Sequence, residues 1–198
     1  MNEPCPGYEK PGHTQSIDAF SIDRTEVTLG DYRKCVDAGA CTPSTRPFVG
    51  DARDLSHLCN WDKPGRDNEP VNCVNWVQAS AYCKWAGRRL PTSAEWEKAA
   101  RGTDGRVYPW GNIWEDGRAN VNSGSLEPVG KYPSGASQYG VLDMVGNVFE
   151  WVQDRNPDGG RDLRGGSWDV ARDFARVSRR NWTNPRYSNA DVGFRCAR

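Results

Sequence analysis

The sequence predicts a loop-rich α+β domain, and three observations lead to this prediction. Helical patterns with clear N-terminal caps occur only in the first half of the chain, whereas turns and short apolar runs make up the second half. This order lacks the regular alternation of strands and helices that βαβ folds require. Twenty-one Gly, 13 Pro and nine Trp indicate many turns and a core that depends on large aromatic side chains.

A single domain over residues 16–198 is expected, preceded by a flexible arm of residues 1–15 that is rich in Pro, Gly and charge. No repeat or domain boundary interrupts it. Lys plus Arg equal Asp plus Glu at 26 each, so the overall charge does not favour nucleic acid as a partner. No apolar stretch reaches the roughly 18 residues that a membrane span needs, and no signal peptide heads the chain. We therefore expect no membrane span.

The first regular elements are predicted before residue 40. Residues 17–27 alternate loosely between apolar and polar positions, which indicates a strand. Thr28, with Asp31 three residues later, predicts a capped helix that continues to about Ala38. Residues 42–72 are polar and contain several prolines, so we expect a long loop there.

Two more helices are predicted from their caps. Asn75 begins a helix over residues 75–86, and a capping box of Thr92 and Glu95 begins another that ends at Gly102. The spacing of apolar residues predicts the buried face of each helix. These faces are expected to contain Val77, Ala81 and Trp85 in the earlier helix and Trp96, Ala99 and Ala100 in the later one.

Seven cysteines constrain the loops. The chain has no Cys-x-x-Cys pair and only two histidines, His13 and His57, so zinc sites are a weak alternative to disulfides. Disulfides in turn favour an extracytoplasmic location, which means the periplasm, the cell surface or the exterior.

Two disulfides follow from spacing. Cys35 and Cys41 flank the end of the predicted helix and favour a local bridge. A bridge between Cys59 and Cys73 would close the long polar loop and contribute roughly 3 kcal/mol in the chain-entropy model. The odd number leaves one thiol, for which Cys5 is the candidate.

The segment of residues 169–191 has no hydrophobic periodicity and is rich in Arg, aromatic residues, Asn, Asp and Ser. Apolar, glycine-marked stretches at residues 163–168 and 192–195 flank it. The pattern predicts an exposed loop region that strands anchor at both ends. Its Trp, Tyr and Arg content favours a recognition surface over a linker.

One stretch could hold an ion. Asp143 and Glu150 flank a turn whose Gly146 and Val148 carbonyls could complete a calcium site, because calcium takes carboxylates together with main-chain oxygens. The alternative is a turn whose acids cap amides or face solvent. No phosphate-binding loop, nucleophile elbow or zinc-protease motif is present, and Ser167 has no base nearby in the sequence. We therefore assign no catalytic residue.

Many motifs lie in register from about Phe20 to the C-terminus. They are Val74-Asn75-Trp76, Ala81-Tyr82-Cys83-Lys84-Trp85-Ala86-Gly87, Arg89-Leu90-Pro91-Thr92, Ala94-Glu95-Trp96-Glu97, Tyr108-Pro109-Trp110-Gly111-Asn112, Asp143-Met144-Val145-Gly146-Asn147, Arg164-Gly165-Gly166-Ser167-Trp168 and Gly193-Phe194-Arg195. Together they closely resemble the formylglycine-generating enzyme (sulfatase-modifying factor) family. The resemblance implies a C-type-lectin-like fold of the formylglycine-generating-enzyme subtype with structural calcium.

Carried over by position, the family's calcium ligands match Asp143, Gly146, Val148 and Glu150. A second family site would begin at Asn120 and the Val121 carbonyl, although the acidic segment that completes it is shortened before Pro128. The resemblance also implies a long-range disulfide between Cys83 and Cys196.

The chain departs from the family at the catalytic metal. Active members bind copper(I) with two cysteines placed five residues apart after the Gly-Gly-Ser turn, and soft thiolates suit that ion. The corresponding positions are Val170 and Ala175 when counted from Ser167, or Ser167 and Arg172 when counted back from Pro185. No cysteine lies between Cys83 and Cys196. We expect no copper site and no formylglycine synthesis by that mechanism.

Three functions remain. The first is a non-catalytic module that binds an unknown protein or small ligand, because the fold resembles the variable proteins of diversity-generating retroelements. The second is an oxidoreductase or maturation enzyme of non-copper chemistry, and the third is a scaffold component of an extracellular or envelope assembly. The expected binding surface, residues 168–191, contains Trp168, Asp169, Arg172, Phe174, Arg176, Asn181, Trp182, Arg186, Tyr187 and Asn189. If that loop only covers the core, it binds nothing.

Overall fold

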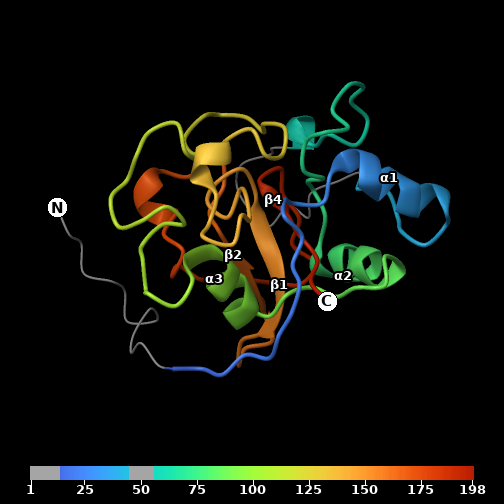
Figure 1. The fold of residues 1–198 in the computed structure, drawn as a ribbon. Helices are drawn as coiled ribbons and strands as arrows, with labels where there is room; N and C mark the ends of the chain where they lie inside the picture. Colours follow the sequence, from blue (N-terminus) through green and yellow to red (C-terminus); the bar gives the residue numbers. More distant parts are fainter. Residues whose placement is uncertain (1–13, 45–55) are drawn as a thin grey trace.

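A computed structural model describes residues 14–44 and 56–198 of the 198-residue chain (Figure 1). The predicted flexible arm, apart from its last two residues, and Cys5 lie outside the described residues. Within the part described, no helix combines the length and the apolar character that a membrane crossing requires.

A four-stranded sheet lies at the centre, with strand order β3-β2-β1-β4. β1 (Phe149–Arg155) and β2 (Arg161–Arg164) are antiparallel, and β3 (Asn181–Thr183) adds to β2 in the same sense. β4 (Val192–Gly193) pairs with β1 in parallel. The sheet therefore comes entirely from the second half of the chain, as the α+β prediction requires.

Three α-helices come from the first half: α1 (Leu29–Asp37), α2 (Trp76–Trp85) and α3 (Ser93–Arg101). Thr28 caps α1, and both other helices begin with complete capping boxes, so all three predicted starts are confirmed. α3 packs against β1 and β2, and α1 contacts α2 on the other side of the sheet (Figure 1). The described residues also form short 3-10 helices, namely η2 (Ser56–Leu58), η3 (Pro133–Gly135) and η4 (Arg172–Phe174).

Two element predictions were wrong in detail. Residues 17–27 form only an isolated bridge from Ile22 to Ala197, because bends at residues 24–25 interrupt the pairing with the C-terminal end. In α2, Val77 and Trp85 are exposed, and the buried residues are Ala79, Tyr82 and Cys83. The spacing of apolar residues predicted the helix but not which of its faces packs against the core.

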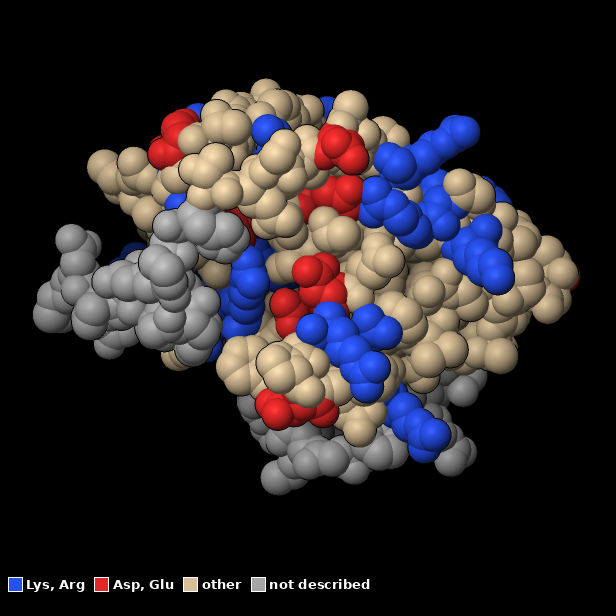
Figure 2. Space-filling model, turned by 90° about the horizontal axis from the view of Figure 1, so that it is seen from below, with Lys and Arg blue, Asp and Glu red and all other residues tan. Residues whose placement is uncertain are grey.

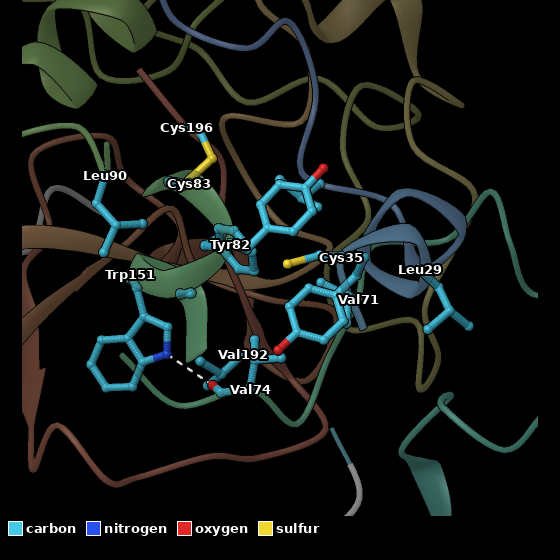
Figure 3. Packing of buried hydrophobic residues seen from close by; sticks show 14 of the residues in the cluster. Leu29, Cys35, Val71, Val74, Tyr82, Cys83, Leu90, Trp151, Val192 and Cys196 are labelled. Atoms are coloured by element: carbon cyan, nitrogen blue, oxygen red, sulfur yellow. Dashed lines mark hydrogen bonds between the residues drawn. A yellow bond between two sulfur atoms is a disulfide. The ribbon is translucent and has the colours of Figure 1, made fainter. Parts of the chain in front are cut away.

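The largest core cluster joins the helices to the sheet (Figure 3). Trp151 of β1 is fully buried, and its indole N–H donates a 2.9 Å hydrogen bond to the carbonyl of Val74 just before α2. Trp76, the first residue of α2, donates in the same way to the carbonyl of Val152 at 2.9 Å. Each buried indole N–H thus has a partner, and the two bonds fix α2 against β1.

All three predicted disulfides form. Cys35–Cys41 joins the last turn of α1 to the following loop, and Cys59–Cys73 closes the loop that directly follows η2. Cys83–Cys196 spans 113 residues and ties α2 to the end of the chain. Such bridges indicate an oxidising environment.

Candidate functional site

The C-terminal surface is built on the turn after β2. The Ser167 hydroxyl lies 3.1 Å from an Asp191 carboxylate oxygen, so the two ends of the segment are joined. The Trp168 amide donates to the Asn147 carbonyl at 3.0 Å, which connects this turn to the Asp143–Glu150 region. Ser167 therefore has a structural role.

Two residues of the predicted binding surface, Trp168 and Asn189, are buried. Trp168 is only 3% exposed and packs with Cys73, Val148 and Ala190, while Asn189 is 8% exposed. This part of the prediction was wrong, because these side chains fill the space between the C-terminal segment and the loop closed by Cys59–Cys73. The segment also contains an edge strand, β3, which its composition did not indicate.

The remaining residues lie at or near the surface. Phe174 is 48% and Trp182 50% exposed, and Asp169, Arg172 and Arg186 are also exposed. The Arg179 guanidinium lies 4.5 Å from the centre of the Phe174 ring, a cation-π contact that holds the ring in place. Arg176, Asn181 and Tyr187 are half-buried at the edges of this area. Eight of the ten predicted residues are therefore exposed or partly exposed.

Arg164 is a buried residue that contacts this segment from β2. It is fully buried in β2, donates to the Val177 carbonyl at 3.1 Å and pairs with Glu97 of α3 at 2.6 Å. Burial alone would raise the pKa of Glu97, but the charges of Arg164 and Arg101 outweigh it and lower that pKa. The ion pair thus joins α3, β2 and the C-terminal segment.

Neither placement of the family's copper cysteines provides a thiol. Counted from Ser167, the two positions are Val170 and Ala175. Counted back from Pro185, they are Ser167 and Arg172. Of these four residues, Ser167 and Ala175 are buried. Every cysteine in the described part of the chain is in a disulfide. The donor set does not match a copper(I) site built from two thiolates.

The two carboxylates predicted to bind calcium, Asp143 and Glu150, both accept hydrogen bonds from protein groups. The Asp143 carboxylate accepts the Gly130 amide at 2.6 Å, and Asp143 itself has a positive φ of 56°. Both oxygens of Glu150 are paired with Arg195 at 2.7 Å, and the Trp96 indole N–H adds a further bond at 2.8 Å. Glu150 is therefore held by Trp96 of α3 and by Arg195 near the C-terminus.

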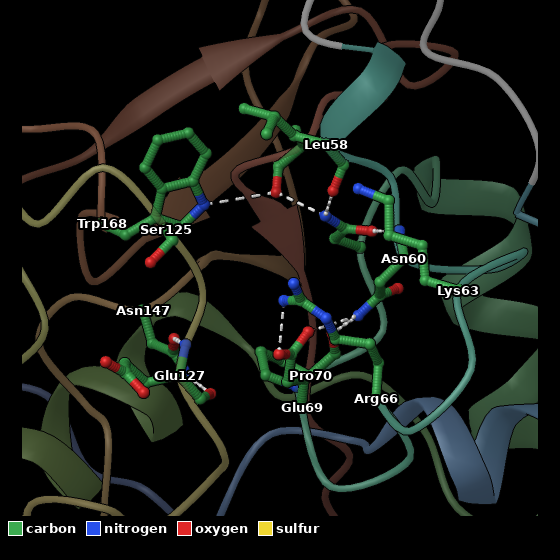
Figure 4. A network of polar contacts seen from close by, with 12 residues as sticks. Leu58, Asn60, Lys63, Arg66, Glu69, Pro70, Ser125, Glu127, Asn147 and Trp168 are labelled. Atoms are coloured by element: carbon green, nitrogen blue, oxygen red, sulfur yellow. Dashed lines mark hydrogen bonds and ion pairs between the residues drawn. The ribbon is translucent and has the colours of Figure 1, made fainter.

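The surroundings of this turn contain two buried oxygens without hydrogen-bond partners, Glu26 Oε2 and Asn120 Oδ1. Asn147 links them, since its side-chain amide donates to Glu26 Oε1 and its oxygen accepts from the Asn120 amide, each at 3.1 Å. Figure 4 shows the same Asn147 side chain against the backbone of Glu127, with bonds of 3.1 and 3.2 Å. Unpaired buried acceptors suit a cation that prefers oxygen.

The sequence did not indicate Glu26. It is buried, and this burial together with the charge of Asp143 raises its pKa well above the usual value for Glu. Within residues 14–44 and 56–198, no three His, Cys, Asp or Glu side chains form a group that could hold a metal by themselves. A calcium site at this turn would therefore also need the main-chain carbonyls of Gly146 and Val148.

The wider surface shows no single sign of charge. On the face drawn in Figure 2, acidic and basic side chains are interspersed. Among the described residues, Arg89 pairs with Glu95 at 2.6 Å and Arg66 with Glu69 at 2.7 Å. This distribution gives no electrostatic reason to expect nucleic acid.

Sequence comparisons with known proteins match nearly the whole chain. Residues 2–198 match the family described as the sulfatase-modifying factor enzyme 1-like domain. Hercynine oxygenase of Mycobacterium tuberculosis is 36% identical over 241 residues, which cover 99% of this chain and 56% of that protein. Inactive C-alpha-formylglycine-generating enzyme 2 of Mus musculus is 41% identical over 150 residues, which cover 65% of this chain and 48% of that protein.

Among solved structures, Treponema denticola variable protein 1 is similar to this fold, with a TM-score of 0.75 and 25% identity. The similarity covers 93% of this chain and 86% of that chain. The chain spans about half the length of the curated relatives it matches. The predicted fold is confirmed.

Proposed function

This chain belongs to the sulfatase-modifying factor enzyme 1-like domain family, and from that premise we propose that it is a non-catalytic binding module whose surface of residues 168–191 recognises a protein or small ligand. The observation that carries the proposal is the chemistry of that segment, which offers no thiol where the family's copper cysteines would stand. What it offers instead are Trp, Phe and Arg side chains on a fixed backbone.

The energetics of interfaces support this assignment. Trp, Tyr and Arg dominate the binding energy of protein interfaces, particularly where the surrounding structure holds them rigidly. Here the Ser167–Asp191 contact and the buried Arg164 hold the segment from both sides. The similarity to a variable protein and to an inactive formylglycine-generating enzyme supports a binding role without catalysis.

A double substitution, Trp182→Ala with Arg186→Ala, tests the surface. A partner would be captured from the source organism, purified, and its affinity for each variant measured by surface plasmon resonance. We expect the double variant to lose at least about tenfold in affinity, because each anchor residue contributes about 1–2 kcal/mol or more. Its melting temperature should change little, since both side chains are exposed.

The matched control is Trp85→Ala with Lys84→Ala, which removes an exposed Trp and a neighbouring cation from α2. This control should bind as the wild type does. Equal losses in both double variants would place the interface elsewhere, and a large loss of stability only in the first would assign the C-terminal loop to the core.

We further propose structural calcium at Asp143, Gly146, Val148 and Glu150, and an extracytoplasmic location. The unpaired oxygens beside the turn support the ion, and the three disulfides support the location. The second site at Asn120 and Val121 rests on the unpaired Asn120 oxygen. Calcium would hold the turn that supports Trp168.

A second candidate function is enzymatic, because the similarity to hercynine oxygenase covers 99% of this chain. In that case the domain would act together with a part of a longer protein that supplies a metal. Metal analysis with an oxygen-consumption assay on a thiol substrate distinguishes the two functions. Stoichiometric iron or copper with oxygen uptake would support the enzyme, whereas calcium alone without uptake would support the binding module.

A further inference from the structure

The buried acids around residues 143–150 are not balanced by buried bases. Glu26 is 2% exposed, Glu150 is fully buried and Asp143 lies at the edge of the interior. Arg195, which is also fully buried, is the cation that acts on all three acids. Three buried acids therefore share one guanidinium, and a bound calcium ion would supply the positive charge that Glu26 lacks.

Arg195 does not balance these acids equally. Its Nε and Nη2 atoms bind the two oxygens of Glu150, and its remaining contacts are the carbonyls of Asp23 and Leu142. The Glu26 carboxyl group accepts the Asn147 side-chain amide on Oε1, and its own backbone amide also acts on it. Glu26 Oε2 is buried and has no hydrogen-bond partner, which is costly for a polar oxygen.

The position of Asn147 brings Glu26 close to the ion-binding turn. Asn147 lies between Gly146 and Val148, the two residues whose carbonyls are candidate calcium ligands. Its own side chain holds Glu26 from the N-terminal segment, 121 residues away in the sequence. Glu26 therefore stands beside the turn without being part of it.

We infer that Glu26 belongs to the calcium site as an outer acid, which supplies negative charge and accepts, through its unpaired Oε2, a hydrogen bond from a water on the ion. This inference rests on the proposed calcium site. An outer position agrees with the absence of a three-acid metal group among the described residues. Partners outside the first coordination shell typically change metal affinity by roughly 10–100-fold when they are removed.

The test compares calcium affinity in the wild type, Glu26→Gln and Glu95→Gln by calorimetric titration of protein stripped with EGTA. Glu26→Gln keeps the shape but removes the charge, so we expect calcium affinity to fall by roughly 10–100-fold. Glu95→Gln is the matched control, because Glu95 is a buried acid paired with Arg89 and Thr92, outside the Glu26, Asp143 and Glu150 cluster. It should leave calcium affinity unchanged.

Melting temperatures in EGTA give an independent readout. Without calcium, Glu26→Gln should be as stable as the wild type or more stable, because it removes a carboxyl group whose charged form is disfavoured by burial. In excess calcium, the melting temperature of Glu26→Gln should rise by less than that of the wild type. Terbium luminescence, sensitised by Trp96 next to Glu150, reports binding at low protein concentration if a variant proves too unstable for calorimetry.

Two results contradict the inference in different ways. Wild-type affinity in Glu26→Gln would remove Glu26 from the site and leave the calcium proposal intact. Absence of calcium binding by the wild type would overturn the calcium proposal and the role of Glu26 together. Glu26→Asp, which restores the charge on a shorter side chain, should recover part of the affinity if charge is the main contribution.

Discussion

Arg195 shows how a single residue organises the interior. Its guanidinium joins β1 through Glu150 and the N-terminal segment through the Asp23 carbonyl, and it reaches the loop before residue 143 through Leu142. The Glu150 carboxylate and the nearby acids outweigh the effect of burial and raise the pKa of Arg195. Arg195 therefore remains charged at any pH at which the protein is folded.

Arg195→Met should lower the free energy of unfolding by about 3–5 kcal/mol, because it leaves Glu150 as a buried charge without its partner. Urea denaturation measures the change. Arg172→Met, which removes an exposed guanidinium, should change stability by no more than about 0.5 kcal/mol. Similar effects in both variants would show that the Arg195 pair adds little to stability.

At the scale of the element, α3 is the helix that connects the sheet to the C-terminal surface. Its apolar stripe of Trp96, Ala99 and Ala100 is buried, as predicted. Its polar side carries Glu97, which binds Arg101 in the same helix and Arg164 in β2. The helix consequently depends on a charged contact as well as on packing.

The lowered pKa of Glu97 makes this contact sensitive to pH. A carboxylate with a lowered pKa in the folded state contributes stability above its unfolded pKa of about 4.3, and loses that contribution as pH falls through the lower folded value. Glu97→Gln should therefore be clearly less stable than the wild type near neutral pH. The difference should shrink below about pH 4. Urea denaturation of both proteins between neutral pH and below about pH 4 measures this difference in stability. A difference that does not change with pH would show that the charge of Glu97 is not responsible.

Sequence patterns predicted the helices far better than the strands. Helix caps are local, so Thr28, Asn75 and Thr92 could be identified from their neighbours alone. The strands have two to seven residues, and β3 and β4 are too short to show any alternation. Their existence depends on pairing with β1 and β2, which no local pattern records.

The residues of the candidate site also differ in how well the sequence predicted them. Composition identified the C-terminal segment as a surface, and Phe174 and Trp182 are indeed exposed. Burial of Trp168 depends on Cys73 and Val148, and the position of Glu26 depends on Asn147 far along the chain. Contacts over such distances are set by the tertiary structure, so one sequence could not reveal them.

At the scale of the whole molecule, the Cys83–Cys196 disulfide adds a covalent connection between the two halves of the chain. Replacing Cys83 and Cys196 together by Ala should lower the free energy of unfolding by about 4–5 kcal/mol, because the bridge closes a loop of 113 residues. Replacing Cys35 and Cys41, which are six residues apart, should cost about 2 kcal/mol in the same model. Chemical denaturation of both variants measures the two losses of unfolding free energy. Equal losses would contradict a contribution that grows with loop length.

The backbone near the two ends of the domain is paired directly. The Ser21 amide donates to the Arg198 carbonyl at 3.0 Å, and the Arg198 amide donates back to Ser21 at 2.8 Å. A domain whose entry and exit lie side by side can be inserted into or appended to a larger polypeptide without separating the flanking chain. The chlamydial protein kinases contain a segment that matches 69% of this chain and forms 25% of their own length, so a similar segment occurs there within a longer chain.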